Sequence, residues 1–151
     1  MAPMHTRLLF AAVLLTVLAP AQAQAQASDN SFGIGAVLGE PTGVTARFMH
    51  GGNNFQAHAA WSLDNDALHV SADYLRSGNI QAGSDIPFYF GLGAVLALAN
   101  DVVLGARVPV GLNHFFSSQP LEIFAEIVPI LTVAPSTDFA LNGALGLRYY
   151  P

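Results

Sequence analysis

The sequence contains no cysteine among its 151 residues, and its five basic residues are all arginine, so lysine is absent as well. The absence of cysteine excludes a disulfide scaffold, a thiolate metal site, a cysteine nucleophile and a lipid anchor on cysteine. The absence of lysine, with ten acidic residues and a net charge of −5, argues against nucleic acid, because phosphate neutralisation requires clustered basic side chains. We therefore expect no nucleic-acid partner.

Charged residues of either sign are scarce. They make up 10% of the chain, whereas 52% of the residues are apolar, and an ordinary soluble domain carries about 25% charge. Beyond residue 27, no apolar run approaches the ~18 residues that a membrane-spanning helix requires. The high apolar content therefore needs an explanation other than a transmembrane helix.

The N-terminal segment has the pattern of an export signal. Arg7 precedes an apolar stretch over residues 8–18, which is followed by Pro20 and by overlapping Ala-x-Ala sites. A membrane anchor is the alternative, but a stretch of about 11 residues is too short to cross the hydrocarbon core. We expect residues 1–27 to be a signal peptide cleaved after Ala27, which leaves residues 28–151 as one exported domain.

From Ser31 onward, turn residues interrupt the chain at short intervals, and the segments between them alternate apolar and polar side chains with a period of two. The segment at residues 77–86 is the one long loop that we expect. The pattern predicts eight strands, at residues 31–39, 42–50, 54–62, 67–76, 87–99, 102–115, 121–133 and 139–150.

The alternation divides these strands into two faces of different chemistry. One face collects large apolar residues, whereas the other holds Gly, Ala, Ser, His and polar side chains. All the charged residues well inside strands fall on the second face, which chance would achieve about one time in 64. These residues are Arg47, Asp73, Arg107, Glu122, Glu126 and Arg148.

Two architectures fit such strands. In a soluble barrel or sandwich the apolar face points inward, whereas in an outer-membrane barrel it faces lipid and the polar face lines the lumen. The small, sparsely charged polar face suits a narrow lumen better than a water-exposed surface. Aromatic residues near strand ends on the apolar face suit a girdle at the lipid interface. The girdle residues are Phe32, Phe48, Phe55, Trp61, Tyr74, Phe88 and Tyr149.

An even number of antiparallel strands closes a sheet whose edges would otherwise be unpaired in lipid. The sequence therefore predicts an all-β fold, an eight-stranded antiparallel up-and-down transmembrane β-barrel, preceded by a cleaved signal peptide. The predicted location is the outer membrane.

Several segments of the chain resemble a family of small, mostly uncharacterised bacterial outer-membrane β-barrel proteins. The resemblance implies an eight-stranded barrel similar in architecture to the transmembrane domain of outer membrane protein A, and it supplies no catalytic residues. The segments that carry it are residues 33–46, 68–75, 87–94, 105–113, 126–130 and 141–150.

The six charged residues on the polar face are expected to form an ion-pair network that fills the lumen, because three arginines balance three carboxylates and guanidinium groups bind carboxylates bidentately. A conducting or binding lumen is the alternative, although eight strands leave an interior only just wide enough for side chains. His58, His69 and Ser71 share this face, but no nucleophile elbow accompanies them and the histidines lack zinc-site spacing. We predict that the protein is not an enzyme and has no catalytic, cofactor-binding or metal-ligating residues.

The predicted function is an integral outer-membrane protein with a structural or membrane-associated role. Its expected partners are the lipid bilayer and the outer-membrane barrel assembly machinery, which reads a terminal strand by pairing with it. The last strand alternates apolar residues up to Tyr149, although Pro151 stands where an aromatic residue is expected. The rival functions are a soluble periplasmic β-barrel that binds a hydrophobic ligand, and a narrow pore.

Pro109 and Pro129 lie inside predicted strands, although proline has no N–H group for the ladder. Pairing these strands about a turn at residues 117–119 brings the two prolines to within about one residue of facing each other. A local bulge there is consistent with the lost donors, and the sequence does not decide whether one forms.

Overall fold

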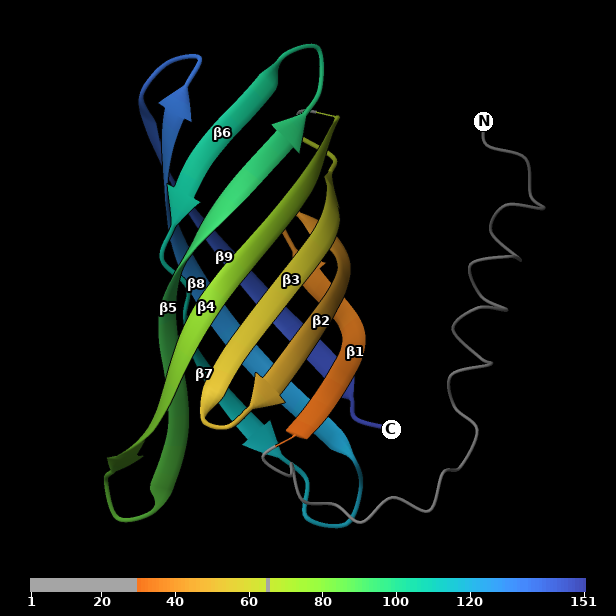
Figure 1. Ribbon diagram of the computed structural model, residues 1–151, viewed down its shortest axis with the longest axis vertical. Helices are drawn as coiled ribbons and strands as arrows, with labels where there is room; N and C mark the ends of the chain where they lie inside the picture. Colours follow the sequence, from red (N-terminus) through yellow and green to blue (C-terminus); the bar gives the residue numbers. More distant parts are fainter. Residues whose placement is uncertain (1–29, 65) are drawn as a thin grey trace, which may run out of the picture.

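The computed structural model describes residues 30–64 and 66–151, and all of its regular structure is β-strand (Figure 1). The predicted signal peptide at residues 1–27 lies outside the described residues. The strands are β1 (Asn30–Gly39), β2 (Thr42–His50), β3 (Asn53–Ser62), β4 (Ala67–Gln81), β5 (Asp85–Leu98), β6 (Val102–Arg107), β7 (Val110–Phe115), β8 (Leu121–Ala134) and β9 (Asp138–Tyr149).

The nine strands form one antiparallel sheet that closes into a ring. Pairing runs from β4 through β3, β2, β1, β9 and β8 to β6 and β7, and both of these pair with β5, which returns to β4. This topology confirms the prediction of an all-β antiparallel fold. β1 begins and β9 ends at the same end of the ring, which we call the terminal end, and the opposite end is the far end (Figure 1).

The ring has nine strands where the sequence predicted eight, because the expected strand at residues 102–115 is divided at Val108 and Pro109. Pro109 has no N–H to donate. Hydrogen bonding nevertheless continues past it, since Val108 N donates to Pro129 O and Gly91 N donates to Pro109 O, each at 3.0 Å. The proline interrupts the strand without separating it from its neighbours.

The register is also unchanged across this break. The residues of β8 that face β6 and β7 count down evenly from Ile130 to Ile127 as one strand passes into the other. The two prolines therefore do not mark a bulge, and the irregularity in this pairing lies between Leu104 and Gly105. β6 and β7 act as one passage of the chain along the ring.

The prediction of a long loop at residues 77–86 is wrong, because most of these residues extend the two neighbouring strands. β4 continues to Gln81 and β5 begins at Asp85, and these two residues face each other across the hairpin. Polar residues such as Ser77 and Asn79 have low strand propensity, so the sequence pattern did not indicate that the ladder holds them. The hairpin projects from the terminal end at the lower left of Figure 1.

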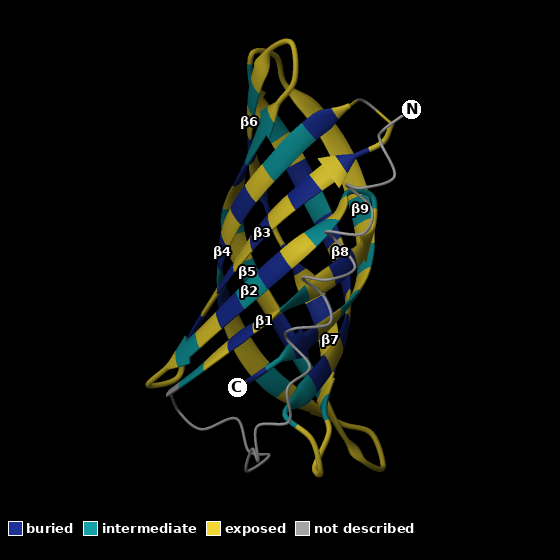
Figure 2. Ribbon diagram, turned by 90° about the vertical axis from the view of Figure 1, so that its right-hand side faces the viewer, coloured by how far each residue is buried: buried dark blue, intermediate teal, exposed yellow. Residues whose placement is uncertain are grey.

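Buried and exposed residues alternate along the strands, as the banding of Figure 2 shows. The outward side chains are large and apolar, and every strand presents at least two of them. The inward set includes all six charged residues expected on the polar face, and Glu122 and Arg148 are 0% exposed. The faces predicted from the sequence are thus those of the structure, with the apolar face outside.

Three interior aromatic rings each lie against a glycine of a neighbouring strand. The absent side chain leaves the room that the ring occupies, as in other sheets where an aromatic residue covers a glycine. The pairs are Tyr89 with Gly111, Phe124 with Gly146 and Tyr150 with Gly33, and a Cβ added to the glycine would lie 2.3, 2.1 and 2.5 Å from the ring.

The described part of the chain contains no helix with the length and hydropathy needed to cross a bilayer.

Candidate functional site

The interior of the ring brings together the six charged residues expected there, in two clusters. In the first cluster, Glu122 Oε1 accepts a hydrogen bond from Arg47 Nη1 at 2.7 Å, and its Oε2 lies 3.3 Å from Arg148 Nη1. Asn113 Nδ2 donates to Oε1 at 2.9 Å and the Tyr150 hydroxyl donates to Oε2 at 2.5 Å. Four donors therefore converge on one fully buried carboxylate.

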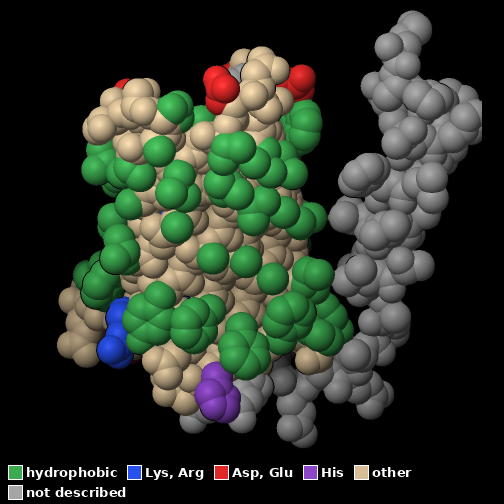
Figure 3. Space-filling view, turned by 45° about the horizontal axis from the view of Figure 1, so that its top comes forward, with side chains coloured by type: hydrophobic (Ala, Val, Ile, Leu, Met, Phe, Trp, Pro, Cys, Tyr) green, Lys and Arg blue, Asp and Glu red, His purple; other side chains and the backbone are tan. Residues whose placement is uncertain are grey.

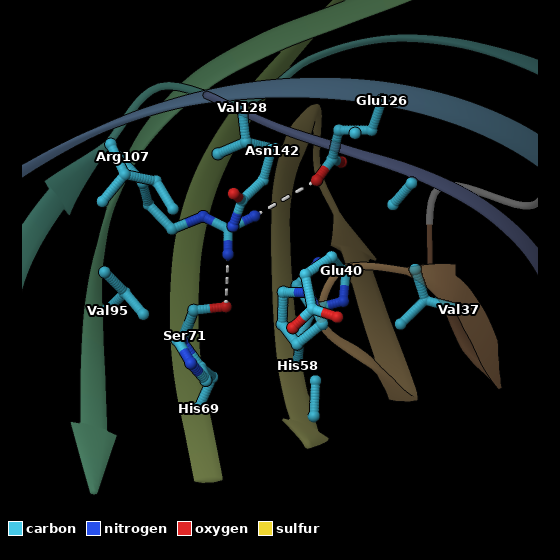
Figure 4. A pocket seen from close by; sticks show the side chains of 15 residues that line it. Val37, Glu40, His58, His69, Ser71, Val95, Arg107, Glu126, Val128 and Asn142 are labelled. Atoms are coloured by element: carbon cyan, nitrogen blue, oxygen red, sulfur yellow. Dashed lines mark hydrogen bonds and ion pairs between the residues drawn. The ribbon is translucent and has the colours of Figure 1, made fainter. Parts of the chain in front are cut away.

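The second cluster holds one cation, Arg107, between the acids Asp73 and Glu126, and Figure 4 shows its contacts with Glu126 and Ser71. Arg107 Nη2 donates to Glu126 Oε1 at 3.1 Å, and its Nη1 donates to Ser71 Oγ at 2.8 Å. Its Nε lies 3.0 Å from Asp73 Oδ1 as an ion pair, although neither atom has hydrogen-bonding geometry there. Glu126 Oε2 also accepts a hydrogen bond from the Tyr89 hydroxyl at 2.8 Å.

Gln56 joins the two clusters. Its Nε2 lies 3.0 Å from both Asp73 Oδ2 and Glu126 Oε2, and its Oε1 accepts a hydrogen bond from Arg148 Nη2 at 2.9 Å. The first cluster has one positive charge in excess and the second has one negative charge in excess. The network is therefore neutral as a whole, which reduces the cost of keeping six charges away from water.

Gly93 makes room for the acid that faces it across the sheet, Asp73. A Cβ at Gly93 would lie 1.9 Å from Asp73 Oδ1 and 2.4 Å from the carbonyl oxygen of Ala72. Gly143 offers a contrast, because an added Cβ there meets only the Glu126 carbonyl oxygen at 3.9 Å.

We therefore expect Gly93→Ala to lower the free energy of unfolding by about 1–3 kcal/mol, the usual cost of overpacking an interior. Gly143→Ala is the matched control and is expected to be neutral or slightly stabilising, because alanine restricts the unfolded chain. Urea unfolding of the purified protein in detergent measures both values. Equal effects of the two substitutions would contradict the contact between Gly93 and the acid.

Two cavities lie on either side of this network, and no residue lines both of them. The cavity toward the far end has a volume of about 40 Å³ and is bounded by side chains of the second cluster, including Arg107 and Glu126. That volume holds one or a few water molecules. The cavity at the terminal end, which we call the vestibule, is open and has a volume of about 410 Å³.

The far cavity also contains the histidines considered for catalysis. His58 faces Ser71 across β3 and β4, but the Ser71 hydroxyl accepts its hydrogen bond from Arg107. Within the described residues, neither His58 Nε2 nor His69 Nε2 has a hydrogen-bond partner. Figure 4 shows Ser71 turned toward the guanidinium, which is not the arrangement of an activated nucleophile.

In residues 30–64 and 66–151, no group of three or more His, Cys, Asp or Glu side chains is arranged to hold a metal ion.

The seven residues predicted as an aromatic girdle lie on the outer wall, but they do not form two even belts. Phe32, Phe48, Phe55 and Tyr74 are successive cross-strand neighbours on β1 to β4. Phe88 and Tyr149 lie toward the terminal end of β5 and β9, whereas Trp61 lies near the far end of β3. The prediction did not include Phe139, which is 65% exposed at the far end of β9.

Sequence reasoning missed the interior aromatic residues of the network. Tyr89, Phe124 and Tyr150 are all buried, and the Arg148 guanidinium lies 3.9 Å from the centre of the Phe124 ring. The alternation of side chains along a strand could have identified them, because Phe124 lies midway between Glu122 and Glu126 and so shares their face. Counting only small and polar residues as interior excluded these rings.

No family model, curated protein or solved structure matches the chain.

Proposed function

We propose that the protein is an integral outer-membrane β-barrel with a structural role in the bilayer and a closed interior. The observation that carries this proposal is the inversion of the usual arrangement, with charged side chains buried inside the ring and large apolar side chains exposed on every strand. Counted with β6 and β7 as one passage, the chain crosses the membrane eight times, an even number as in bacterial barrels of this kind.

The outer wall supports this proposal because its apolar surface surrounds the ring. Hydrophobic side chains cover the face seen in Figure 3 between an acidic upper end and a lower end with arginine and histidine. Monomeric soluble proteins rarely expose apolar patches larger than a few hundred Å². Lipid chains would cover such a wall, and strands such as β3, of 10 residues, match the about 9–11 residues that a tilted strand needs.

The interior favours neither of the rival functions. A carrier of hydrophobic ligands needs a cavity of about 300–1,000 Å³, whereas the far cavity has a volume of about 40 Å³ and holds only one or a few water molecules. A pore needs a continuous aqueous path, whereas Gln56 and the first cluster lie between the far cavity and the vestibule. The network thus acts as a plug made of side chains.

The same proposal includes export through the signal peptide at residues 1–27 and recognition by the barrel assembly machinery. β9 presents Leu141, Leu145 and Leu147 outward, and all three are exposed. Tyr149 is the last residue of β9 and faces Ile34 of β1. The pairing of these two strands closes the ring. Fractionation of cells that express the full chain tests the location, because the protein should sediment with outer membranes and need detergent for release.

The single tryptophan provides a direct test of the lipid-facing wall. Trp61 is 46% exposed near the far end of the ring, so in vesicles we expect its fluorescence to be quenched by lipids brominated near the glycerol. Aqueous iodide should have little effect. Strong iodide quenching without quenching by brominated lipid would contradict the proposal.

A second tryptophan position gives the matched control for depth. Leu92 is 64% exposed at the middle of β5, and Leu92→Trp is made in a Trp61→Phe background. We expect bromine near the methyl end of the lipid chain to quench this residue more than Trp61. In a water-soluble ring, iodide would quench both residues.

A further inference from the structure

The vestibule at the terminal end is a polar recess with a one-sided charge. Its floor includes Arg47, Asn54 and Asn113, which are 1%, 7% and 9% exposed. Ser77 lies on the wall and accepts hydrogen bonds from Asn54 Nδ2 at 3.0 Å and from Arg47 Nη2 at 3.4 Å. Arg76 lies at the rim, where its guanidinium carbon is 5.7 Å from the centre of the Tyr74 ring.

Among the described residues that line the vestibule, two are arginines and none is an acid. The positive charge of the floor is only partly compensated, because Arg47 and Arg148 share the single carboxylate Glu122. Arg47 also keeps a donor free, since its Nε has no hydrogen-bond partner in the part of the chain that the structure describes. The vestibule therefore has a positive potential, and at its floor the Nε–H of Arg47 is a buried donor without a partner within the described chain.

The far end of the ring has the opposite character. Its turns and strand ends carry the exposed acids Asp64, Asp66, Asp101 and Asp138, and Figure 3 shows acidic groups at this end. The hairpin at the terminal end carries the exposed acid Asp85, so an anion is repelled less at the terminal end than at the far end.

We propose that the vestibule binds a phosphate group. Guanidinium groups bind phosphate oxygens through paired N–H donors. The amides of Asn54 and Asn113 donate one N–H each, to Ser77 and Glu122 respectively, and retain a second N–H for the same phosphate oxygens. The volume of about 410 Å³ lies within the range of small-molecule sites, about 300–1,000 Å³. The phosphate comes from a lipid headgroup or from a small soluble phosphate ester, and both present the same oxygens to the site.

The lipid source rests on the proposed membrane location, whereas binding of a soluble phosphate ester does not. Two measurements on the full-length protein in an uncharged detergent separate the sources. Isothermal titration with glycerol phosphate measures soluble ester binding, and native mass spectrometry counts retained phosphatidylglycerol and phosphatidylcholine. Binding of glycerol phosphate without retained lipid identifies a soluble ligand, and retention of phosphatidylglycerol alone identifies a headgroup.

Two variants change the vestibule without touching the buried network. Arg76→Gln removes the rim cation, and Asn79→Asp adds an acid to the exposed wall; Asn79 also lines the recess. We expect each to weaken phosphate binding at least about tenfold, the effect of losing one charge-assisted contact. Asn100→Asp is the matched control, because it makes the same chemical change in the turn after β5 at the far end.

The proposal is supported if the wild-type protein and Asn100→Asp bind one phosphate ligand alike and both vestibule variants bind it more weakly. It is overturned if the wild-type protein shows no saturable binding in either measurement. Equal binding by all four proteins also overturns it, because the ligand would then lie elsewhere. If the Trp61 quenching experiment fails while glycerol phosphate binds, the site stands without the membrane proposal.

Discussion

Replacing Glu122 by glutamine is expected to lower the free energy of unfolding by about 3–5 kcal/mol, the cost of leaving a buried charge without its partner. The carboxylate accepts four hydrogen bonds, from Arg47, Arg148, Asn113 and Tyr150. A glutamine has nearly the same shape, but its NH₂ group would face donors in place of an acceptor. The guanidinium groups of Arg47 and Arg148 would then remain buried without the carboxylate that pairs with both of them. Urea unfolding in detergent, followed by tryptophan fluorescence, measures the change.

Asp101→Asn is the matched control for this substitution. It makes the same change from carboxylate to amide, and Asp101 is an exposed residue in the turn between β5 and β6. We expect its effect to stay within about 0.5 kcal/mol, as for most surface substitutions. If both variants unfold at the same urea concentration, the carboxylate of Glu122 does not hold the interior charges together. A double-mutant cycle with Arg47→Met would then show no coupling energy.

The faces of the sheet could be predicted from the sequence because strand parity is a strict geometric constraint. Once Leu92 points outward, its neighbours Gly91 and Gly93 must point inward, and the same reasoning places every charged residue of the network. Which cation would meet which acid could not be predicted. Arg47 and Glu122 are 75 residues apart in sequence, and they meet only because the closed ring brings β2 and β8 to opposite sides of one narrow interior.

The remaining differences between the predicted and the observed strands arise where strand pairing outweighs the local preferences of the residues. Asn79 faces Pro87 in an extended hairpin that neither residue favours by itself, since both are uncommon in strands. Pro109 was recognised as a missing donor, but its effect is confined to one hydrogen bond because the register continues on both sides. The glycine that receives each interior ring could not be identified before the register was known.

Placing arginine at Leu92 is expected to have the largest effect on the outer wall. Leu92 lies at the middle of β5 and is 64% exposed, so in water an arginine there would cost almost nothing. In a bilayer the same position lies near the midplane, where arginine costs about 2–4 kcal/mol. We expect Leu92→Arg to reduce sharply the fraction that folds into vesicles, whereas Leu92→Phe should fold normally. The different gel mobilities of folded and boiled protein measure the folded fraction.

The variant Val102→Arg distinguishes the effect of depth in the membrane from the effect of solvent exposure. Val102 is 62% exposed, almost the same as Leu92, but it begins β6 at the far end of the ring. Arginine near the bilayer surface costs only about 0–1 kcal/mol, so Val102→Arg should fold into vesicles nearly as well as the unmodified protein. Solvent exposure by itself predicts the same tolerance at both positions. Equal folding of the two arginine variants would therefore mean that the apolar wall does not lie in lipid, and a strong difference would fix the depth of β5 in the bilayer.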